Sequence, residues 1–158
     1  MNEIRVFSIG KITNQNDNAG ILLEVKYAPA LKGLQGYSHV QVVWWMDGCD
    51  NETDRAVLTE EKPYTKGPDE IGIFALRSPE RPNPIAVSNA QITHIDEEKG
   101  IVGLTYIDAY EGSAVLDIKP YTPSIDRVES PRTPNWCGHW PKSVEESGSF
   151  DWAAEFNF

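Results

Sequence analysis

The sequence predicts an all-β, single-domain protein that folds as an antiparallel β-barrel of about seven strands with short helices and a proline-rich C-terminal tail. Short runs of alternating or β-branched apolar residues dominate the chain. Its length of 158 residues fits one domain. No long amphipathic helices alternate with these runs, and no glycine-rich phosphate loop follows one, which argues against a doubly wound nucleotide-binding fold.

The expected strands are separated by glycine and proline residues. They cover residues 4–10, 21–27, 38–46, 71–76, 85–95, 101–107 and 115–121. The turn sequence Glu98-Lys99-Gly100 predicts that the fifth and sixth strands form a hairpin. A closed or nearly closed barrel buries the aromatic side chains and hides the strand edges, which is why we favour it over an open sheet.

Only short helices are expected. Asn51 or Thr53 can cap a short helix that continues to residues 58–61, and a second, acidic helix is expected over residues 149–156. Residues 122–142 are rich in proline and are expected to follow the surface without regular structure.

The end of the chain differs from the rest in composition. Trp136 and Trp140 are expected to pin the proline-rich tail to the body of the protein. We therefore expect a barrel domain over residues 1–127 and a C-terminal extension over residues 128–158 that packs on the same domain.

The formal net charge of −10 is unevenly distributed. Residues 47–70 hold eight acidic and three basic side chains, and residues 143–158 hold four acidic and no basic ones. These two segments carry most of the excess charge, so the remainder can present a local basic patch to a nucleic acid.

Cysteine usage and hydropathy indicate a cytoplasmic protein. No apolar run approaches the roughly 20 residues of a membrane helix, and the first residues lack the pattern of a signal peptide. Cys49 and Cys137 lie far apart in sequence and are expected to be free thiols in a reducing compartment. Cys137 and His139 are too few ligands for a zinc site, so we expect no metal.

The most unusual segment is RSPERPNPI, residues 77–85, with three X-Pro bonds within six residues. Each proline fixes its own φ and favours an extended residue before it, so the loop is stiff. A stiff loop that carries Arg77, Arg81 and Asn83 between two apolar strands is suited to present polar groups to a ligand. In the alternative, the prolines only block pairing at a strand edge.

The second segment is IDAYEGSAVLDIKPY, residues 107–121. Asp108 and Glu111 flank an expected turn at Gly112. Asp117 and Lys119 are two apart, so a strand places them on one face, where they either face a site together or form a solvated ion pair of little consequence.

The stretches RSPERPNPIAVS, residues 106–112 and VLDIKPY resemble the TrmO family of tRNA methyltransferases, also called TsaA-like or YaeB-like. FSIGKI, LKGLQGYSHVQVV and GIFAL support the resemblance, which covers residues 4–127 in order. It implies a β-barrel, usually a homodimer, that binds S-adenosylmethionine (SAM) on loops. It also implies tRNA as the partner, and methyl transfer to the exocyclic amine of threonylcarbamoyladenosine beside the anticodon.

The resemblance also implies the roles of individual residues. The cofactor contacts fall at Met46, Asp47, Gly48, Arg77, Ser78, Ser88, Asn89, Asp108, Ala109 and Tyr110. The catalytic group is Asp117, Lys119 and Tyr121, and substrate contacts are assigned to Arg81, Asn83 and Lys119.

The chemistry of SAM suits these residue types. Arginine binds a carboxylate, and a carboxylate or an aromatic ring stabilises a sulfonium cation, which fits Arg77 and Asp108. A carbamoyl-substituted amine is a weak nucleophile, so alignment with the methyl group matters, and Asp117 is the expected acceptor of the departing proton. Lys119 or Arg81 is expected to steer phosphate. The alternative is a SAM-binding barrel that methylates or senses a small molecule or a protein.

Overall fold

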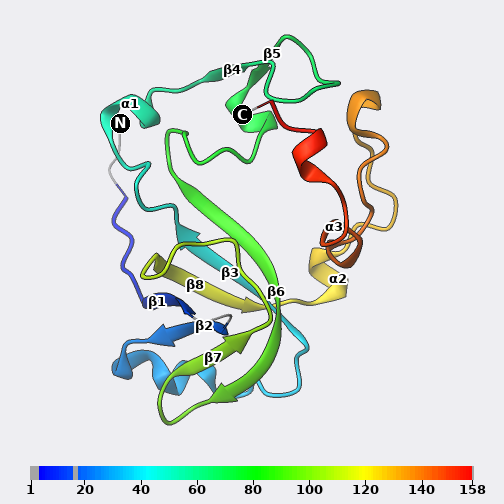
Figure 1. Cartoon of the computed structure of the whole chain (residues 1–158). Coiled ribbons are helices and arrows are strands. Elements are labelled where there is room, and N and C mark those ends of the chain that lie inside the picture. Colours follow the sequence, from blue (N-terminus) through cyan, green and yellow to red (C-terminus); the bar gives the residue numbers. More distant parts are fainter. Residues whose placement is uncertain (1–3, 16–17, 158) are drawn as a thin grey trace.

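The computed structural model describes residues 4–15 and 18–157 (Figure 1). Six strands form a closed antiparallel barrel in the order β1-β2-β7-β6-β3-β8, with β8 paired back to β1. The barrel strands are β1 (Gly10–Gln15), β2 (Asn18–Leu23), β3 (His39–Trp45), β6 (Ile85–Asp96), β7 (Ile101–Leu104) and β8 (Ala114–Pro120). The predicted all-β barrel is therefore confirmed, with six strands in place of about seven, because the strand expected over residues 71–76 lies outside the barrel.

A second, two-stranded sheet and several short helical segments complete the chain. The sheet pairs β4 (Thr59–Glu61) with β5 (Glu70–Gly72). The α-helices are α1 (Glu52–Arg55), α2 (Pro123–Asp126) and α3 (Val144–Ser147). The 3-10 helices are η1 (Val25–Leu31), η2 (Ile73–Ala75), η3 (Asn135–Cys137) and η4 (Trp152–Ala154). No helix in this described part of the chain is both long and apolar enough to cross a membrane.

Four of the expected strands have clearly different bounds, and the one expected over residues 101–107 ends at Leu104. The strand expected over residues 4–10 begins only at Gly10, where the pairing of β1 with both β2 and β8 starts. The second strand ends at Leu23 and is followed by η1, whose Pro29 has no N–H to donate to a sheet. The strand expected over residues 71–76 ends at Gly72 and continues as η2.

The expected helices are partly wrong. Asn51 does cap α1, and its Oδ1 accepts a hydrogen bond from the Asp54 N–H at 3.0 Å, but the helix ends at Arg55 instead of reaching residues 58–61. Within residues 149–156 only the single turn η4 forms. The stretch expected to be irregular, residues 122–142, contains α2 and η3.

The predicted hairpin between the fifth and sixth expected strands is confirmed as β6 and β7. They pair antiparallel, with Asp96 opposite Ile101. Gly100 in the turn has φ +69°, a left-handed conformation that glycine adopts without a steric penalty.

Alternation along β3 separates the core from an outer face. Val40, Val42 and Trp44 are buried inside the barrel. Gln41 and Val43 lie between them and therefore point outward, as do their partners on the neighbouring strands. Apart from Trp44, the barrel core is made of aliphatic side chains, among them Ile12, Ile21, Val40, Val42, Val102 and Val115, each fully buried.

Aromatic side chains hold the C-terminal segment in place. Trp136 stacks on Tyr64 at a centroid distance of 5.1 Å, and Trp140 meets the same ring edge-on at 5.0 Å. Phe156 also contacts Tyr64, and Figure 1 shows the C-terminal end beside the β4–β5 sheet. The two tryptophans thus pin the tail, as expected from the sequence.

Glu155 is the buried charge of this tail, with 6% of its surface exposed. One carboxylate oxygen accepts from His139 Nε2 at 2.7 Å and the other from Trp140 Nε1 at 3.1 Å. Lys66 Nζ lies 3.7 Å from the first oxygen. Hydrogen bonds from His139 and Trp140 hold the pKa of Glu155 below its ordinary value of 4.5.

Docking of the tail should therefore weaken in acid. A lowered pKa in the folded state means that the charged Glu155 stabilises the fold above the unfolded pKa, and this stabilisation is lost as the pH falls below 4.5. We expect the tryptophan emission to shift to longer wavelength over that acid range. Glu155→Gln should remove this part of the pH dependence; an unchanged acid profile in the variant would contradict the assignment.

Candidate functional site

The first half of β6 extends beyond β7, and a wide hollow lies along this edge of the closed barrel. β7 pairs with β6 only from Ile92 onward, so residues 85–91 have β3 on one side and no strand on the other in the described chain. A groove of about 860 Å³ lies there. Its walls come from the end of β3, the start of β6, the loop before β6 and the loop after β7. This hollow is called the β6 groove below.

Eight of the residues that the sequence singled out line the β6 groove. They are Met46, Asp47, Arg77, Arg81, Ser88, Asp108, Ala109 and Tyr110. The fold therefore brings together groups that lie up to 64 positions apart, from Met46 to Tyr110. Gly48, Ser78, Asn83 and Asn89 are not part of the lining.

The loop before β6 is held from behind by Arg81. Its Nη2 donates to the carbonyl oxygens of Ile73 at 2.8 Å and of Leu76 at 2.7 Å. The Nε of Arg81 is buried and has no partner among the described residues. Arg81 thus ties η2 to the loop while its side chain also borders the groove.

Arg55 of α1 holds the same loop from the other side. Its Nη1 donates to the Pro82 carbonyl at 2.8 Å, and its Nε donates to Asp50 at 2.5 Å. The guanidinium also lies over the Trp45 ring, 5.5 Å from the centroid. The three prolines and these two arginines give the loop a fixed shape.

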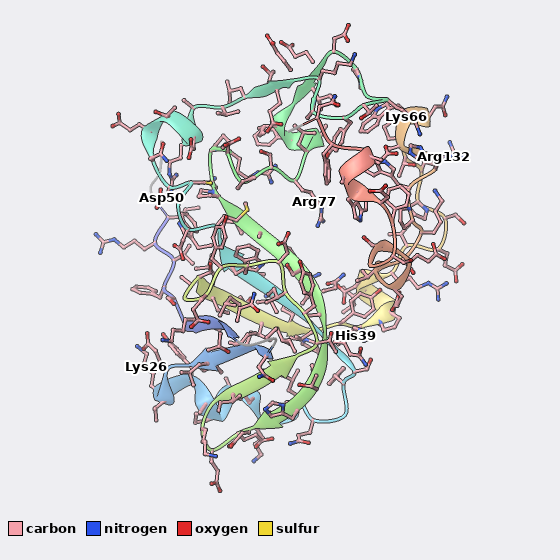
Figure 2. All side chains as sticks on the ribbon, viewed as in Figure 1. Lys26, His39, Asp50, Lys66, Arg77 and Arg132 are labelled. Atoms are coloured by element: carbon pink, nitrogen blue, oxygen red, sulfur yellow. The ribbon has the colours of Figure 1, made fainter. Side chains whose placement is uncertain are left out.

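Arg77 differs from Arg81 because it is exposed and makes no hydrogen bond or ion pair with any residue in the described ranges. Figure 2 shows its side chain projecting between β6 and the C-terminal segment. A guanidinium that is free of internal partners and borders a groove is available to an anionic ligand.

This difference predicts that only the loss of Arg81 lowers the stability of the fold. Arg81→Ala removes two charge-assisted hydrogen bonds and should destabilise the fold by about 2 kcal/mol, which lowers Tm by roughly 4–8 °C in a protein of this size. Arg77→Ala, in the same loop, should leave Tm unchanged. Thermal unfolding followed by circular dichroism tests the pair. Equal Tm values for the two variants would contradict the role of Arg81 as a clamp.

Ser88 and Asn89 point to opposite sides of β6. Ser88 faces inward, where its Oγ accepts a hydrogen bond from Trp44 Nε1 at 3.0 Å. Asn89 faces outward and its Oδ1 accepts from Gln41 Nε2 at 3.3 Å. Only Ser88 therefore reaches the groove, although the two residues are neighbours in sequence.

The turn after β7 is tied to the first hairpin. Asn14 Nδ2 donates to the Ala109 carbonyl at 3.0 Å, and the Asn14 N–H donates to Glu111 at 2.5 Å. Gly112 has φ +88°, which lets the chain reverse into β8. These contacts fix the position of Asp108 and Tyr110 at the mouth of the groove.

The groove is also lined by side chains that the sequence motifs did not assign to a site, among them Phe74, Tyr106 and Cys49. Phe74 and Tyr106 are exposed, by 86% and 68%, as is Tyr110 by 81%. The period-two pattern of residues 71–76 gave no reason to single out Phe74, because it reads as one position of an ordinary strand. Tyr106 belongs to the motif at residues 106–112, two residues before Asp108, and this position was a signal that could have assigned it to the site.

Two groups in the groove stay protonated at neutral pH. Partial burial and the nearby Asp108 raise the pKa of Tyr106. Burial, with Asp54 and Glu80, raises the pKa of the Cys49 thiol. Cys49 is therefore no activated nucleophile. Together with the exposed aromatic rings, these groups make the groove suited to bind a ligand, and its arginines and carboxylates can orient a zwitterion.

Asp117, Lys119 and Tyr121 lie outside the β6 groove. Asp117 and Lys119 form an ion pair on the outer face of β8. Tyr121 packs against His39 at the far end of β3, at a centroid distance of 6.4 Å. Asp117 also borders a smaller hollow of about 370 Å³ beside Tyr27 and Tyr37.

The sheet register relates these residues to the groove. Asp117 lies opposite Val43, which lies opposite Val87, and Val87 lines the groove. Two strand spacings, about 10 Å, therefore separate Asp117 from the groove edge across the outer face. In the next row, Lys119 lies opposite Gln41, which lies opposite Asn89. We call these two rows the outer face.

No three histidine, cysteine, aspartate or glutamate side chains gather into a metal site within residues 4–15 and 18–157. The Cys137 thiol is buried, and His139 is bound to Glu155.

A closed antiparallel barrel with a loop-built groove at an open strand edge defines a barrel-type ligand-binding protein, distinct from the doubly wound enzymes that bind nucleotides at a sheet crevice. Residues 10–127 match the family described as the tRNA-methyltransferase O N-terminal domain. The chain belongs to this family, and the resemblance noted in the sequence is confirmed.

Individual relatives agree with this assignment. The chain is 35% identical over 103 residues to an S-adenosyl-L-methionine-binding protein of Archaeoglobus fulgidus, with 65% of this chain and 68% of that protein covered. It is 30% identical over 125 residues to the tRNA (adenine(37)-N6)-methyltransferase of Escherichia coli, with 75% of this chain covered. The chain spans about half, 51%, of that enzyme's length.

Solved structures give the same fold. The crystal structure of TrmO from Pseudomonas aeruginosa superposes with a TM-score of 0.63 at 25% identity. The superposition covers 83% of this chain and 62% of that one.

Proposed function

We propose that the protein is a SAM-dependent methyltransferase that methylates the exocyclic amine of threonylcarbamoyladenosine at the anticodon-adjacent position of tRNA. The observation that carries the proposal is the β6 groove, where eight residues of the family motifs meet from distant parts of the chain. The names of the relatives support both the cofactor and the tRNA substrate.

The groove fits SAM in size and in chemistry. Its volume of about 860 Å³ lies within the range of small-molecule sites. Arg77 would hold the carboxylate of the cofactor's amino-acid part, and Asp108 with Tyr110 would stabilise the positive sulfonium. The unpaired edge of β6 offers backbone groups to the adenine. When bound, SAM supplies an electrophilic methyl group.

The outer face is the proposed acceptor site. The exocyclic amine must lose a proton as it is methylated, and Asp117 would accept it. Lys119 would attract tRNA phosphate, while Tyr121 and Asn83 would border the substrate. Arg81 would act there mainly by shaping the loop, since its Nη2 is bound to two carbonyl oxygens. The proposal includes the roles of Gly48, Ser78 and Asn89 as more distant cofactor contacts.

The proposal extends to assembly and location. The exposed apolar side chains of Ile4, Val6 and Phe7 favour a covering partner, and a second copy of the chain is the expected one. We expect the homodimer to work in the cytoplasm, where tRNA is modified and Cys49 and Cys137 stay as free thiols.

A second candidate is a SAM-binding barrel that methylates or senses a small molecule or a protein. The net charge of −10 favours it, because clustered acidic side chains repel nucleic acid. The A. fulgidus relative is named for SAM binding alone.

Calorimetric titration with SAM, in the presence and absence of tRNA, tests the proposal and separates the candidates. We expect a dissociation constant in the micromolar range and a change in affinity when tRNA is added. SAM binding that tRNA leaves unchanged would favour the second candidate. No binding of SAM below millimolar concentration would contradict both.

A further inference from the structure

The C-terminal segment docks on the part of the chain that leads into the β6 groove. The Thr65 N–H donates to the Glu155 carbonyl at 2.9 Å, and the Asn157 N–H donates to the Pro63 carbonyl at 3.1 Å. Residues 57–76 are called the arm below, and residues 135–157 the tail. The tail lies beyond residue 127, where the family match ends.

The arm has a conformation that the tail supports. Lys62 has φ +39°, a left-handed conformation that costs energy for a residue with a side chain. Its carbonyl accepts a hydrogen bond from Asn157 Nδ2 at 2.8 Å. Tyr64, two residues further, forms a bridge with Phe156 of the tail. The tail thus supplies a hydrogen bond and a β-bridge that hold this strained stretch in place.

Apolar packing connects the docked tail with the groove. Ile71, Ile73 and Leu76 of the arm form a small core of their own, and Trp136 of the tail packs against it. Leu76 immediately precedes Arg77, and the carbonyls of Ile73 and Leu76 are the two acceptors of Arg81. A continuous set of contacts therefore runs from the tail to the base of Arg77.

Glu155 is at the centre of the polar contacts between the tail and the arm. Its carboxylate joins His139 and Trp140 of the tail to Lys66 of the arm, and Lys66 Nζ also lies 3.3 Å from His139 Nε2. Figure 2 shows Lys66 beside the tail. Removing a buried carboxylate leaves its donors without an acceptor, which is more costly than losing a surface charge.

We propose that Glu155 is a positioning residue that fixes the tail on the arm and thereby sets Arg77 at the β6 groove for the carboxylate of SAM. The inference rests on the proposed function, because it holds that the docking of the tail strengthens SAM binding. The tail and the groove are then coupled. When the tail detaches, the arm becomes more mobile, and the backbone at Arg77 is no longer held in one position.

The test compares Glu155→Ala and Glu155→Gln with Glu129→Ala, a control that removes an exposed carboxylate between the barrel and the tail, one without a partner among the described residues. Hydrogen exchange measured without ligand should rise in residues 59–76 for Glu155→Ala and remain unchanged in β3 and β6. Glu155→Gln keeps one acceptor oxygen and should restore part of the protection. Unchanged exchange in the arm of Glu155→Ala would overturn the proposal.

Ligand binding separates positioning from a structural role. Glu155→Ala should weaken SAM binding by about tenfold or more, yet leave the affinity for 5′-methylthioadenosine, which lacks the carboxylate, nearly unchanged. In an Arg77→Ala background the effect of Glu155→Ala on SAM should vanish. Equal losses for both ligands, or additive effects of the two substitutions, would overturn the role of Arg77.

If Glu155→Ala unfolds globally, the milder Glu155→Gln decides the test. Wild-type SAM affinity in Glu155→Gln would then count against the proposal. Failure of the proposed function is recognised separately. In that case the wild-type protein binds neither SAM nor 5′-methylthioadenosine, while hydrogen exchange still decides whether Glu155 holds the arm.

Discussion

Replacing Arg77 by alanine is expected to weaken SAM binding by about 10- to 100-fold, the loss of one charge-assisted, bidentate contact with a carboxylate. Tm should not change, because Arg77 has no hydrogen bond or ion pair with the described residues. Calorimetric titration of the variant with SAM and a thermal melt measure both quantities. The side chain is exposed at the groove, so its truncation creates no cavity.

Arg77→Lys is the matched control. Lysine keeps the positive charge but cannot offer two parallel N–H donors, so its affinity for SAM should lie between those of the wild type and Arg77→Ala. Wild-type affinity in Arg77→Ala would contradict the assignment of the carboxylate site. A large fall in Tm would make the arginine structural.

Asp117→Asn is expected to lower kcat for methyl transfer by about 100-fold or more, the usual range for loss of a proton acceptor. SAM affinity should be unaffected, because Asp117 lies across the outer face, two strands from the groove edge. Single-turnover kinetics with SAM and tRNA measure the chemical step, and calorimetry measures the binding of SAM.

Lys119→Met controls for the ion pair between Asp117 and Lys119. It breaks the same pair but leaves the carboxylate in place, so it should weaken the affinity for tRNA more than it lowers kcat. Equal falls in kcat for the two variants would mean that the ion pair matters only as a structural contact. A normal kcat in Asp117→Asn would exclude Asp117 as the proton acceptor.

Much of the fold could be predicted from local patterns. Alternation marked the barrel strands, and Gly100 marked the turn of the β6–β7 hairpin, because both signals lie within a few residues. The ends of strands were harder. Residues 4–8 have a strand pattern, but contact with β8 begins only at Ile9, whose N–H donates to the Val115 carbonyl, and this depends on how distant segments meet.

Local patterns likewise predicted one part of the candidate site, and the other part depends on contacts between distant segments. The stiff loop and the turn around Gly112 could be found in the sequence, and the fold brings Arg77 and Asp108 to one groove. The inward direction of Ser88 and the outward direction of Asn89 follow from the register with β3, which the sequence does not contain. The clamp made by Arg81 and the docking of Glu155 depend on η2 and the tail, whose paths were not predicted.

The central claim is that this barrel transfers a methyl group from SAM to threonylcarbamoyladenosine in tRNA. The most direct measurement is transfer from labelled SAM to total tRNA from cells that lack this gene, followed by nucleoside analysis by mass spectrometry. The claim predicts labelled, methylated threonylcarbamoyladenosine, and none with tRNA that lacks the threonylcarbamoyl group. Absence of that nucleoside, from a protein that binds SAM, would contradict it.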